Sequence, residues 1–156
     1  MDITALSGPE NSGKTSTFEK VYDALKGDTW HFKLKKDKHF YKKEVTSGIT
    51  EVITPRSLDF VAIFEEISTS KIIGISSYGD DRNTVELALS QLKRENCDMV
   101  FLACRTKGGS KNVITEFDLS PTILLKTIYH HSNNTQQDCC NIMDAEEILM
   151  QLMSRI

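Results

Sequence analysis

Several features that would indicate a particular class of protein are missing from this sequence of 156 residues. The first residues lack the basic segment and apolar stretch of a signal peptide, and no run approaches the roughly 18 apolar residues of a membrane-spanning helix. A net charge of −3 argues against a globally basic nucleic-acid-binding protein. With 39% hydrophobic and 26% charged residues, the composition gives no indication of disorder. We therefore expect neither a signal peptide nor a membrane span.

The spacing of a zinc site is also missing. The four cysteines are Cys97, Cys104, Cys139 and Cys140. The first two flank or lie in an apolar segment, where cysteine usually acts as a small hydrophobic residue. The pairs His130-His131 and Cys139-Cys140 are an alternative metal site that we do not favour, because adjacent side chains cannot easily both point inward. Reduced cysteines are typical of a cytoplasmic protein, which is the location we expect.

The most informative stretch is residues 8–15, which read Gly-Pro-Glu-Asn-Ser-Gly-Lys-Thr, the pattern G-x-x-x-x-G-K-T. A short apolar strand is predicted before it, at residues 2–7. Residues 14–26 follow with apolar side chains at helical spacing, and Gly27 ends the pattern. The stretch is therefore a glycine-bounded loop between a strand and a helix.

This setting is the one that phosphate binding needs. Gly8 and Gly13 allow the backbone to wrap closely around an anion, with free N–H groups at the positive end of the helix. Lys14 is then placed to reach the β- and γ-phosphates, and the hydroxyl of Thr15 is placed to ligate Mg²⁺.

These residues and their flanks resemble the Walker A motif of the P-loop NTPases. The resemblance covers only the N-terminal strand, loop and helix, and it indicates no particular family within the superfamily. It implies that the ligands are Mg²⁺ and ATP, or another nucleoside triphosphate. The residues that it implies for nucleotide binding are Gly8, Pro9, Glu10, Asn11, Ser12, Gly13, Lys14, Thr15 and Ser16.

A basic segment with interleaved aromatic residues follows, opened by a predicted strand at residues 29–35. Lysines beside aromatic rings are what a surface for single-stranded nucleic acid uses. We favour the alternative of a solvated edge strand or loop that lysines protect against edge pairing, because the rest of the chain is acidic. Residues 44–56 could form a strand pair or an extended loop. The lysines are Lys33, Lys35, Lys36, Lys38, Lys42 and Lys43.

Two apolar runs, residues 60–64 and 72–76, are too close together for a crossover helix and predict an antiparallel hairpin. A hairpin at this place is similar to the arrangement in small GTPases. If the second run is parallel to residues 2–7, its carboxyl end points at the glycine-rich loop. Glu65 and Glu66 then lie at the opposite end of the sheet, and we exclude them from the site.

Asp80 and Asp81 follow the second run and are our candidates for Mg²⁺ ligands opposite Thr15. The segment departs from familiar patterns, because no Asp ends the strand directly and it reads Gly-Asp where GTPases read Asp-x-x-Gly. The alternative is that the pair serves as a turn and helix cap. Asp59, near the start of the hairpin, is the next candidate.

A capping box opens a predicted helix at residues 83–95, and a continuous apolar run at 99–104 is typical of a buried parallel strand. Arg105 and Lys107 come directly after it. Either could stabilise charge on the γ-phosphate or line the base pocket, or both could be solvated residues of a glycine-rich loop. The segment lacks the Asn-Lys-x-Asp signature by which GTPases read guanine, which favours ATP.

The C-terminal part predicts a short helix at residues 111–119, a strand at 122–129, a loop at 130–141 and a closing helix opened by a capping box at Asp144. We expect a single domain over residues 1–156. Its predicted fold is α/β, a three-layer α/β/α sandwich with a mostly parallel sheet and one antiparallel hairpin strand, as in P-loop NTPases.

Our leading hypothesis is a small Mg²⁺-dependent protein that binds a nucleoside triphosphate and hydrolyses the β–γ bond of ATP, with Lys14, Asp80 and Arg105 as catalytic residues. One alternative is a small-molecule or nucleotide kinase, which the scarcity of arginine disfavours. Another is a nucleotide-switched binding module that acts on protein or nucleic acid. A partner protein or a second copy could activate slow turnover. We expect no membrane partner and do not favour nucleic acid.

Overall fold

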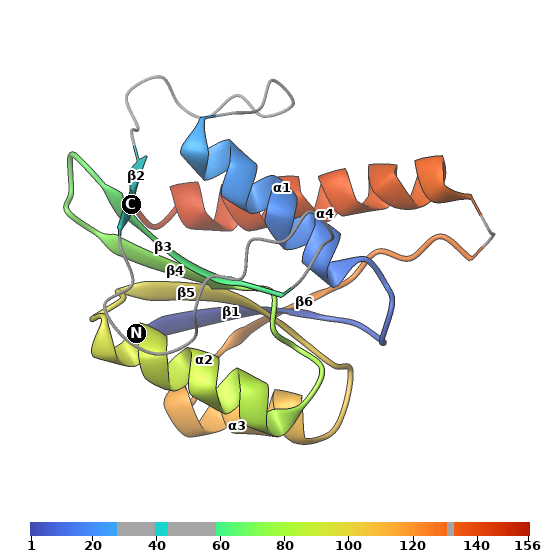
Figure 1. Ribbon diagram of the computed structural model, residues 1–156, viewed down its shortest axis with the longest axis horizontal. Coiled ribbons are helices and arrows are strands. Elements are labelled where there is room, and N and C mark those ends of the chain that lie inside the picture. The colour runs from blue at the N-terminus through green and yellow to red at the C-terminus, as the bar shows by residue number, and fades with distance from the viewer. Residues whose placement is uncertain (28–39, 44–58, 131–132) are drawn as a thin grey trace.

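The computed structural model describes residues 1–27, 40–43, 59–130 and 133–156, in which strands and helices alternate (Figure 1). The strands are β1 (Asp2–Ser7), β2 (Phe40–Lys43), β3 (Val61–Glu66), β4 (Ile72–Ser76), β5 (Met99–Cys104) and β6 (Thr122–Leu125). The helices are α1 (Lys14–Lys26), α2 (Arg82–Arg94), α3 (Gly109–Phe117) and α4 (Asn134–Met153).

The strands form one sheet in the order β2-β3-β4-β5-β1-β6. β4, β5, β1 and β6 are parallel, whereas β3 is antiparallel to both of its neighbours. Among the described strands β3 alone runs against the rest, as the predicted hairpin requires. Val61 at the start of β3 pairs with Ser76 at the end of β4. The residues just before β3 therefore lie at the same edge as those that follow β4.

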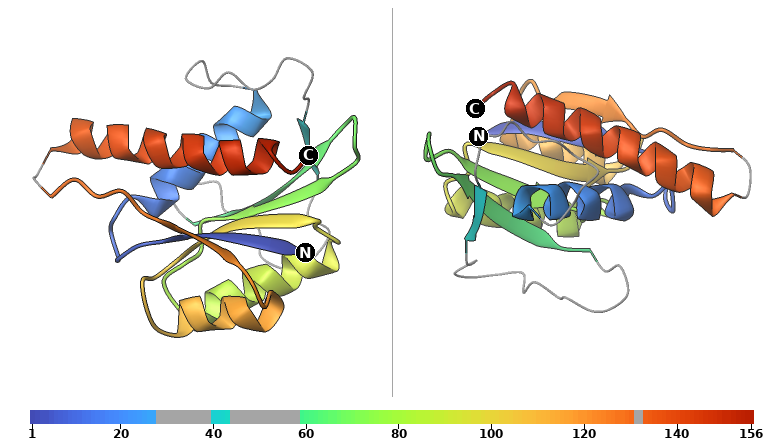
Figure 2. Two further views of the ribbon diagram at one scale, coloured as in Figure 1. Left: turned by 180° about the vertical axis from the view of Figure 1, so that it is seen from behind. Right: turned by 90° about the horizontal axis from the view of Figure 1, so that it is seen from above.

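Helices cover both faces of the sheet and create three layers (Figure 1 and Figure 2). On one face α1 and α4 bury apolar side chains such as Phe18 and Ile148. On the other, α2 and α3 bury side chains such as Leu89 and Ile114. β5 is buried at every position, as expected of a strand covered on both faces. The predicted α/β class and mostly parallel sheet are confirmed.

The last helix differs from the prediction. α4 begins at Asn134, so the predicted loop is wrong from residue 134 to residue 141, and the capping box at Asp144 is wrong as well. Asn133 caps the helix instead. Asp144 lies well inside α4 and accepts a hydrogen bond from the ammonium of Lys126 at 2.6 Å. Composition suggested a loop because it takes no account of such tertiary partners, which stabilise a polar segment as helix.

Other boundaries differ by a few residues. α2 begins at Arg82 and is capped by Asp81, whose carboxylate accepts a hydrogen bond from the backbone N–H of Thr84 at 3.0 Å. The predicted capping box at residues 83–86 is therefore wrong. α3 begins and ends earlier than predicted, and β6 ends at Leu125 rather than at residue 129. The order of the elements is unaffected.

Part of the basic segment lies outside the described residues, together with the predicted strand at 29–35 and residues 44–56. Lys42 and Lys43 belong to β2, which ends the sheet on one side within the described part of the chain. Every described helix is too short or too polar to cross a lipid bilayer.

Candidate functional site

The glycine-rich loop between β1 and α1 is shaped by its two glycines. Gly13 has a φ of 88°, in the left-handed region, and a Cβ there would collide with the side chain of Asn141. A Cβ on Gly8 would lie 2.6 Å from the Cβ of Lys126. The backbone can therefore follow this path because both positions lack a side chain.

Lys14 begins α1 and its side chain turns back over the loop. The ammonium donates hydrogen bonds to the carbonyl oxygens of Gly8 at 3.0 Å and Pro9 at 2.5 Å, and the side chain is nearly buried. Burial lowers the pKa of Lys14 below its usual value, and the nearby carboxylate of Asp80 opposes this shift. The site thus holds a cation that is poorly solvated, which strengthens its attraction for an anion.

Thr15 connects the first turn of α1 to the β3–β4 hairpin. Its hydroxyl donates a hydrogen bond to Oδ1 of Asp59 at 2.8 Å. The same carboxylate oxygen accepts a hydrogen bond from the hydroxyl of Ser77 at 3.0 Å. Ser77 Oγ in turn accepts a hydrogen bond from the backbone N–H of Phe60 at 2.9 Å. Three segments of the chain therefore converge on one carboxylate.

These groups line an open pocket of about 290 Å³. It lies beyond the carboxyl ends of β1 and β4, the edge at which open α/β sheets bind ligands. The structure thus brings the predicted residues Lys14, Thr15 and Asp80 together, and adds Asp59 to them. The lining residues are Asn11, Ser12, Gly13, Lys14, Thr15, Ser16, Asp59, Ser77 and Asp80.

Asp80 lies near Arg105, the residue after β5 that the sequence suggested as a catalytic residue. The Nε atom of Arg105 lies 3.9 Å from Oδ1 of Asp80, and Nη2 lies 3.2 Å from Oε2 of Glu10 in the loop. The turn before Asp80 passes close to the end of β5, because a Cβ on Gly79 would lie 2.8 Å from the backbone of Ala103. The absence of a side chain at Gly79 is what allows Asp80 to approach Arg105.

Several residues of the predicted site do not line the pocket: Gly8, Pro9, Glu10, Asp81, Arg105 and Lys107. The carboxylate of Asp81 binds the backbone and hydroxyl of Thr84, and these hydrogen bonds lower the pKa of Asp81. Asp81 therefore has the helix-capping position that the sequence left open as the alternative. Glu65 and Glu66 lie at the far end of β3, as predicted.

Two supporting residues from α4 were not predicted. The side-chain amide of Gln137 donates a hydrogen bond to the carbonyl oxygen of Ser12 at 3.2 Å and another to Asn141 at 3.0 Å. Asn141 is buried and packs beneath Gly13. No local signal in the sequence marks these amides, because Gln137 is separated from Ser12 by 125 positions.

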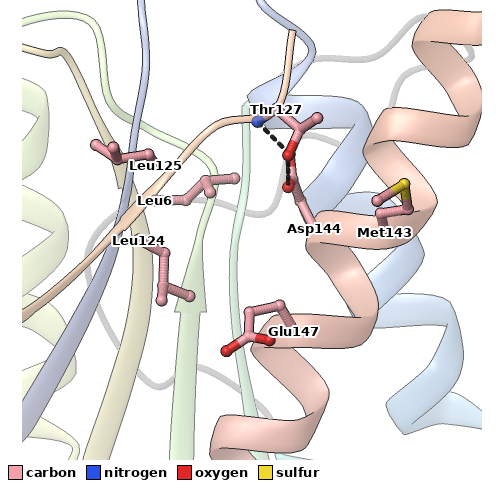
Figure 3. Close-up of a pocket in the computed structure, with 7 residues that line it drawn as sticks. All are labelled: Leu6, Leu124, Leu125, Thr127, Met143, Asp144 and Glu147. Carbon is pink, nitrogen blue, oxygen red and sulfur yellow. Dashed lines mark hydrogen bonds between the residues drawn. The ribbon is translucent and has the colours of Figure 1, made fainter.

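A second pocket, of about 320 Å³, lies between β6 and α4 (Figure 3). Asp144 faces it, but both oxygens of this carboxylate already accept hydrogen bonds from Thr127, and one also accepts from Lys126. The pocket that Lys14 and Thr15 line is therefore the stronger candidate for chemistry. The residues that line the second pocket are Leu6, Leu124, Leu125, Thr127, Met143, Asp144 and Glu147.

No family model, curated protein or solved structure matches this chain. The functional assignment therefore depends on the residues of the site and their geometry.

Proposed function

We propose that the chain is a small Mg²⁺-dependent protein that binds a nucleoside triphosphate in the pocket lined by Lys14 and Thr15 and hydrolyses the β–γ bond of ATP. The observation that carries this proposal is the shared pocket of Lys14, Thr15 and the carboxylates Asp59 and Asp80. We also infer a fold of the P-loop NTPase type. It is supported by the loop between β1 and α1 at the carboxyl edge of a mostly parallel sheet.

The phosphates of the nucleotide bind along the glycine-rich loop. There the positive end of α1 favours negative charge, and backbone N–H groups of its first turn can donate to phosphate oxygens. Lys14 exchanges the carbonyl oxygens of Gly8 and Pro9 for oxygens of the β- and γ-phosphates. The two carbonyls thus keep the ammonium hydrogen-bonded until the ligand arrives.

The oxygen ligands of the pocket fit Mg²⁺. This ion prefers hard oxygen donors and is commonly held by one or two carboxylates together with substrate phosphates and water. Asp59 and Asp80 supply the carboxylates, and Thr15 supplies a hydroxyl that already faces Asp59 at 2.8 Å. The described residues contain no group of three or more His, Cys, Asp or Glu that could hold a metal ion. We therefore propose that the nucleotide itself completes the coordination.

Hydrolysis needs an attacking water and stabilisation of the charge that develops. The water oxygen forms a bond to the γ-phosphorus while the bond from that phosphorus to the β–γ bridging oxygen breaks. The electron pair of this bond leaves with ADP, and the proton of the water passes to the released phosphate or to solvent. Lys14 and Arg105 stabilise negative charge on the phosphoryl oxygens.

A panel of nucleotides, tested for Mg²⁺-dependent thermal stabilisation and then for products, tests the proposal. We expect triphosphates to raise the unfolding temperature and ATP to release inorganic phosphate. Transfer of phosphate to a small molecule or nucleotide would instead indicate a kinase, and stabilisation without turnover a nucleotide-switched module. A protein that no nucleotide stabilises would contradict the proposal.

A further inference from the structure

Arg105 lies between carboxylates from two different loops. Its Nη2 atom is 3.2 Å from Oε2 of Glu10, and its Nε atom is 3.9 Å from Oδ1 of Asp80. Glu10 belongs to the glycine-rich loop, whereas Asp80 follows β4. The guanidinium therefore occupies a position between the phosphate-binding loop and a proposed metal ligand.

The main chain of Arg105 is fixed on both sides. Its backbone N–H donates a hydrogen bond to the hydroxyl of Ser110 at 3.0 Å, and its carbonyl oxygen accepts one from the hydroxyl of Ser7 at 3.3 Å. Both serines are buried. The side chain, which is 38% exposed, is the part of Arg105 that can change partners.

The hydrogen bonding of this guanidinium is incomplete. Nε of Arg105 is buried and has no hydrogen-bond acceptor among the described residues, since Asp80 at 3.9 Å is too distant. A buried donor without an acceptor is destabilising. Asp80, the distant neighbour of this donor, lines the pocket. A phosphoryl oxygen within reach of the guanidinium would satisfy the donor, and phosphate oxygens match the planar fork of an arginine better than a single distant carboxylate oxygen does.

We propose that Glu10 is a positioning residue that holds Arg105 while the γ-phosphate is absent and releases it when a triphosphate binds. Glu10 and the γ-phosphate are anions that compete for one guanidinium. ADP lacks the γ-phosphate and leaves the Glu10–Arg105 pair intact. The exchange of partners thus makes the protein distinguish ATP from ADP through Arg105. This inference rests on the proposed function, because it assigns a specificity device to the same nucleotide site.

Calorimetric titration with Mg-ATP and Mg-ADP tests it on the parent, Glu10→Gln, Arg105→Gln and the double variant. The measured quantity is the ratio of ATP affinity to ADP affinity. Because both side chains of the ion pair are partly exposed to solvent, we expect Glu10→Gln to raise this ratio by about two- to fivefold. Arg105→Gln should lower the ratio below that of the parent, and Glu10→Gln should then have no further effect on it.

A merely electrostatic role of Glu10 predicts another pattern. Loss of one negative charge near the loop would improve the binding of both nucleotides, somewhat more for the more highly charged Mg-ATP, and would raise the ratio equally with or without Arg105. That result, or a ratio that Glu10→Gln does not change, would contradict the proposed exchange of partners by Arg105. The proposal that the protein binds nucleotides would still stand. A parent protein that binds neither nucleotide overturns the proposed function, and the exchange with it.

Discussion

A carboxylate lies at each end of strand β3, and the two differ in where their hydrogen-bond donors come from. Asp59, just before the strand, accepts hydrogen bonds from Thr15 and Ser77, which belong to α1 and to the segment after β4. Glu66, the last residue of the strand, accepts hydrogen bonds from the hydroxyls and backbone N–H groups of Ser68 and Thr69. One carboxylate connects distant segments and the other closes its own turn.

The difference separates a structural role from a candidate functional one. Both oxygens of Glu66 are occupied by the turn, and these hydrogen bonds, led by the one from Thr69, lower the pKa of Glu66 to about 2. Asp59 lines a pocket together with Lys14. Glu66 stabilises the fold, because both of its oxygens accept hydrogen bonds within its own turn. Asp59 faces a pocket, where a ligand can reach it.

Among the changes at the two ends of β3, the larger effect on binding is expected at the pocket end. Asp59→Asn should weaken Mg²⁺-dependent nucleotide binding by about 10- to 100-fold, because the neutral amide is a poor ligand for Mg²⁺. The amide oxygen can still accept the hydrogen bond from Thr15, so thermal unfolding should stay close to that of the parent. Calorimetric titration with and without Mg²⁺ measures the binding. Unchanged affinity in Asp59→Asn would remove this residue from the site.

Glu66→Gln is the matched change at the other end, and we expect the reverse result. An amide presents one acceptor oxygen where the carboxylate has two, so donors of Ser68 and Thr69 lose partners and the unfolding temperature should fall by several degrees. Nucleotide affinity should be unaffected. A variant that keeps its stability but loses nucleotide binding would reverse the assignment of the two ends.

The lowered pKa of Glu66 also predicts how the free energy of unfolding depends on pH. The pKa of Glu66 is lowered in the folded state from 4.5 to about 2, so its contribution is fully present above 4.5 and is lost as the pH falls from 4.5 towards 2. Denaturant unfolding over this range should show a steeper loss of stability in the parent than in Glu66→Gln. Equal slopes would contradict the hydrogen-bonded carboxylate.

Asp80 and Asp81 extend the comparison to adjacent residues. Asp80→Asn should reduce Mg²⁺-dependent turnover, whereas Asp81→Ala should mainly cost about 1 kcal/mol of stability through loss of the helix cap. Phosphate release and chemical denaturation measure the two effects. Equal turnover in both variants would leave Asp59 as the principal metal ligand.

The smallest effect concerns the pH dependence of binding. Burial lowers the pKa of Lys14 below 10.5, and an anion needs its charged form, so affinity should decline as the pH rises through a value below 10.5. Tyr78 and Cys104, both nearby, have pKa values raised mainly by burial, which moves their titration to higher pH. Titrations at several alkaline pH values measure the decline. Constant affinity up to 10.5 would contradict the lowered pKa.

The two ends of β3 also show what sequence could and could not predict. The glycine-rich loop could be predicted because its residues are contiguous and its strand–helix setting follows from local periodicity. Asp59 took only second place because its partner Thr15 lies 44 positions away. The antiparallel direction of the hairpin was the available signal, since it places the start of β3 beside the end of β4.

The N-terminal half of α4 could not be predicted for a related reason. Its polar residues resemble those of a loop, and their helical state depends on contacts such as the hydrogen bond from Gln137 to the carbonyl of Ser12. The composition of a segment does not indicate such contacts with distant residues. The same contacts support the loop that is proposed to bind phosphate. The helical state of this segment and the supporting role of Gln137 and Asn141 were therefore missed for one reason, since both depend on contacts between residues far apart in the sequence.

The most direct test of the central claim is calorimetric titration of the parent and of Lys14→Ala with Mg-ATP. Lys20→Ala is the matched control, because Lys20 also lies on α1 but pairs with Asp138 at 2.9 Å and does not line the pocket. The account predicts saturable binding to the parent and the control, and at least a roughly 100-fold loss in Lys14→Ala, since a charge-assisted contact to phosphate disappears. Equal binding of Mg-ATP by Lys14→Ala and the parent would contradict it.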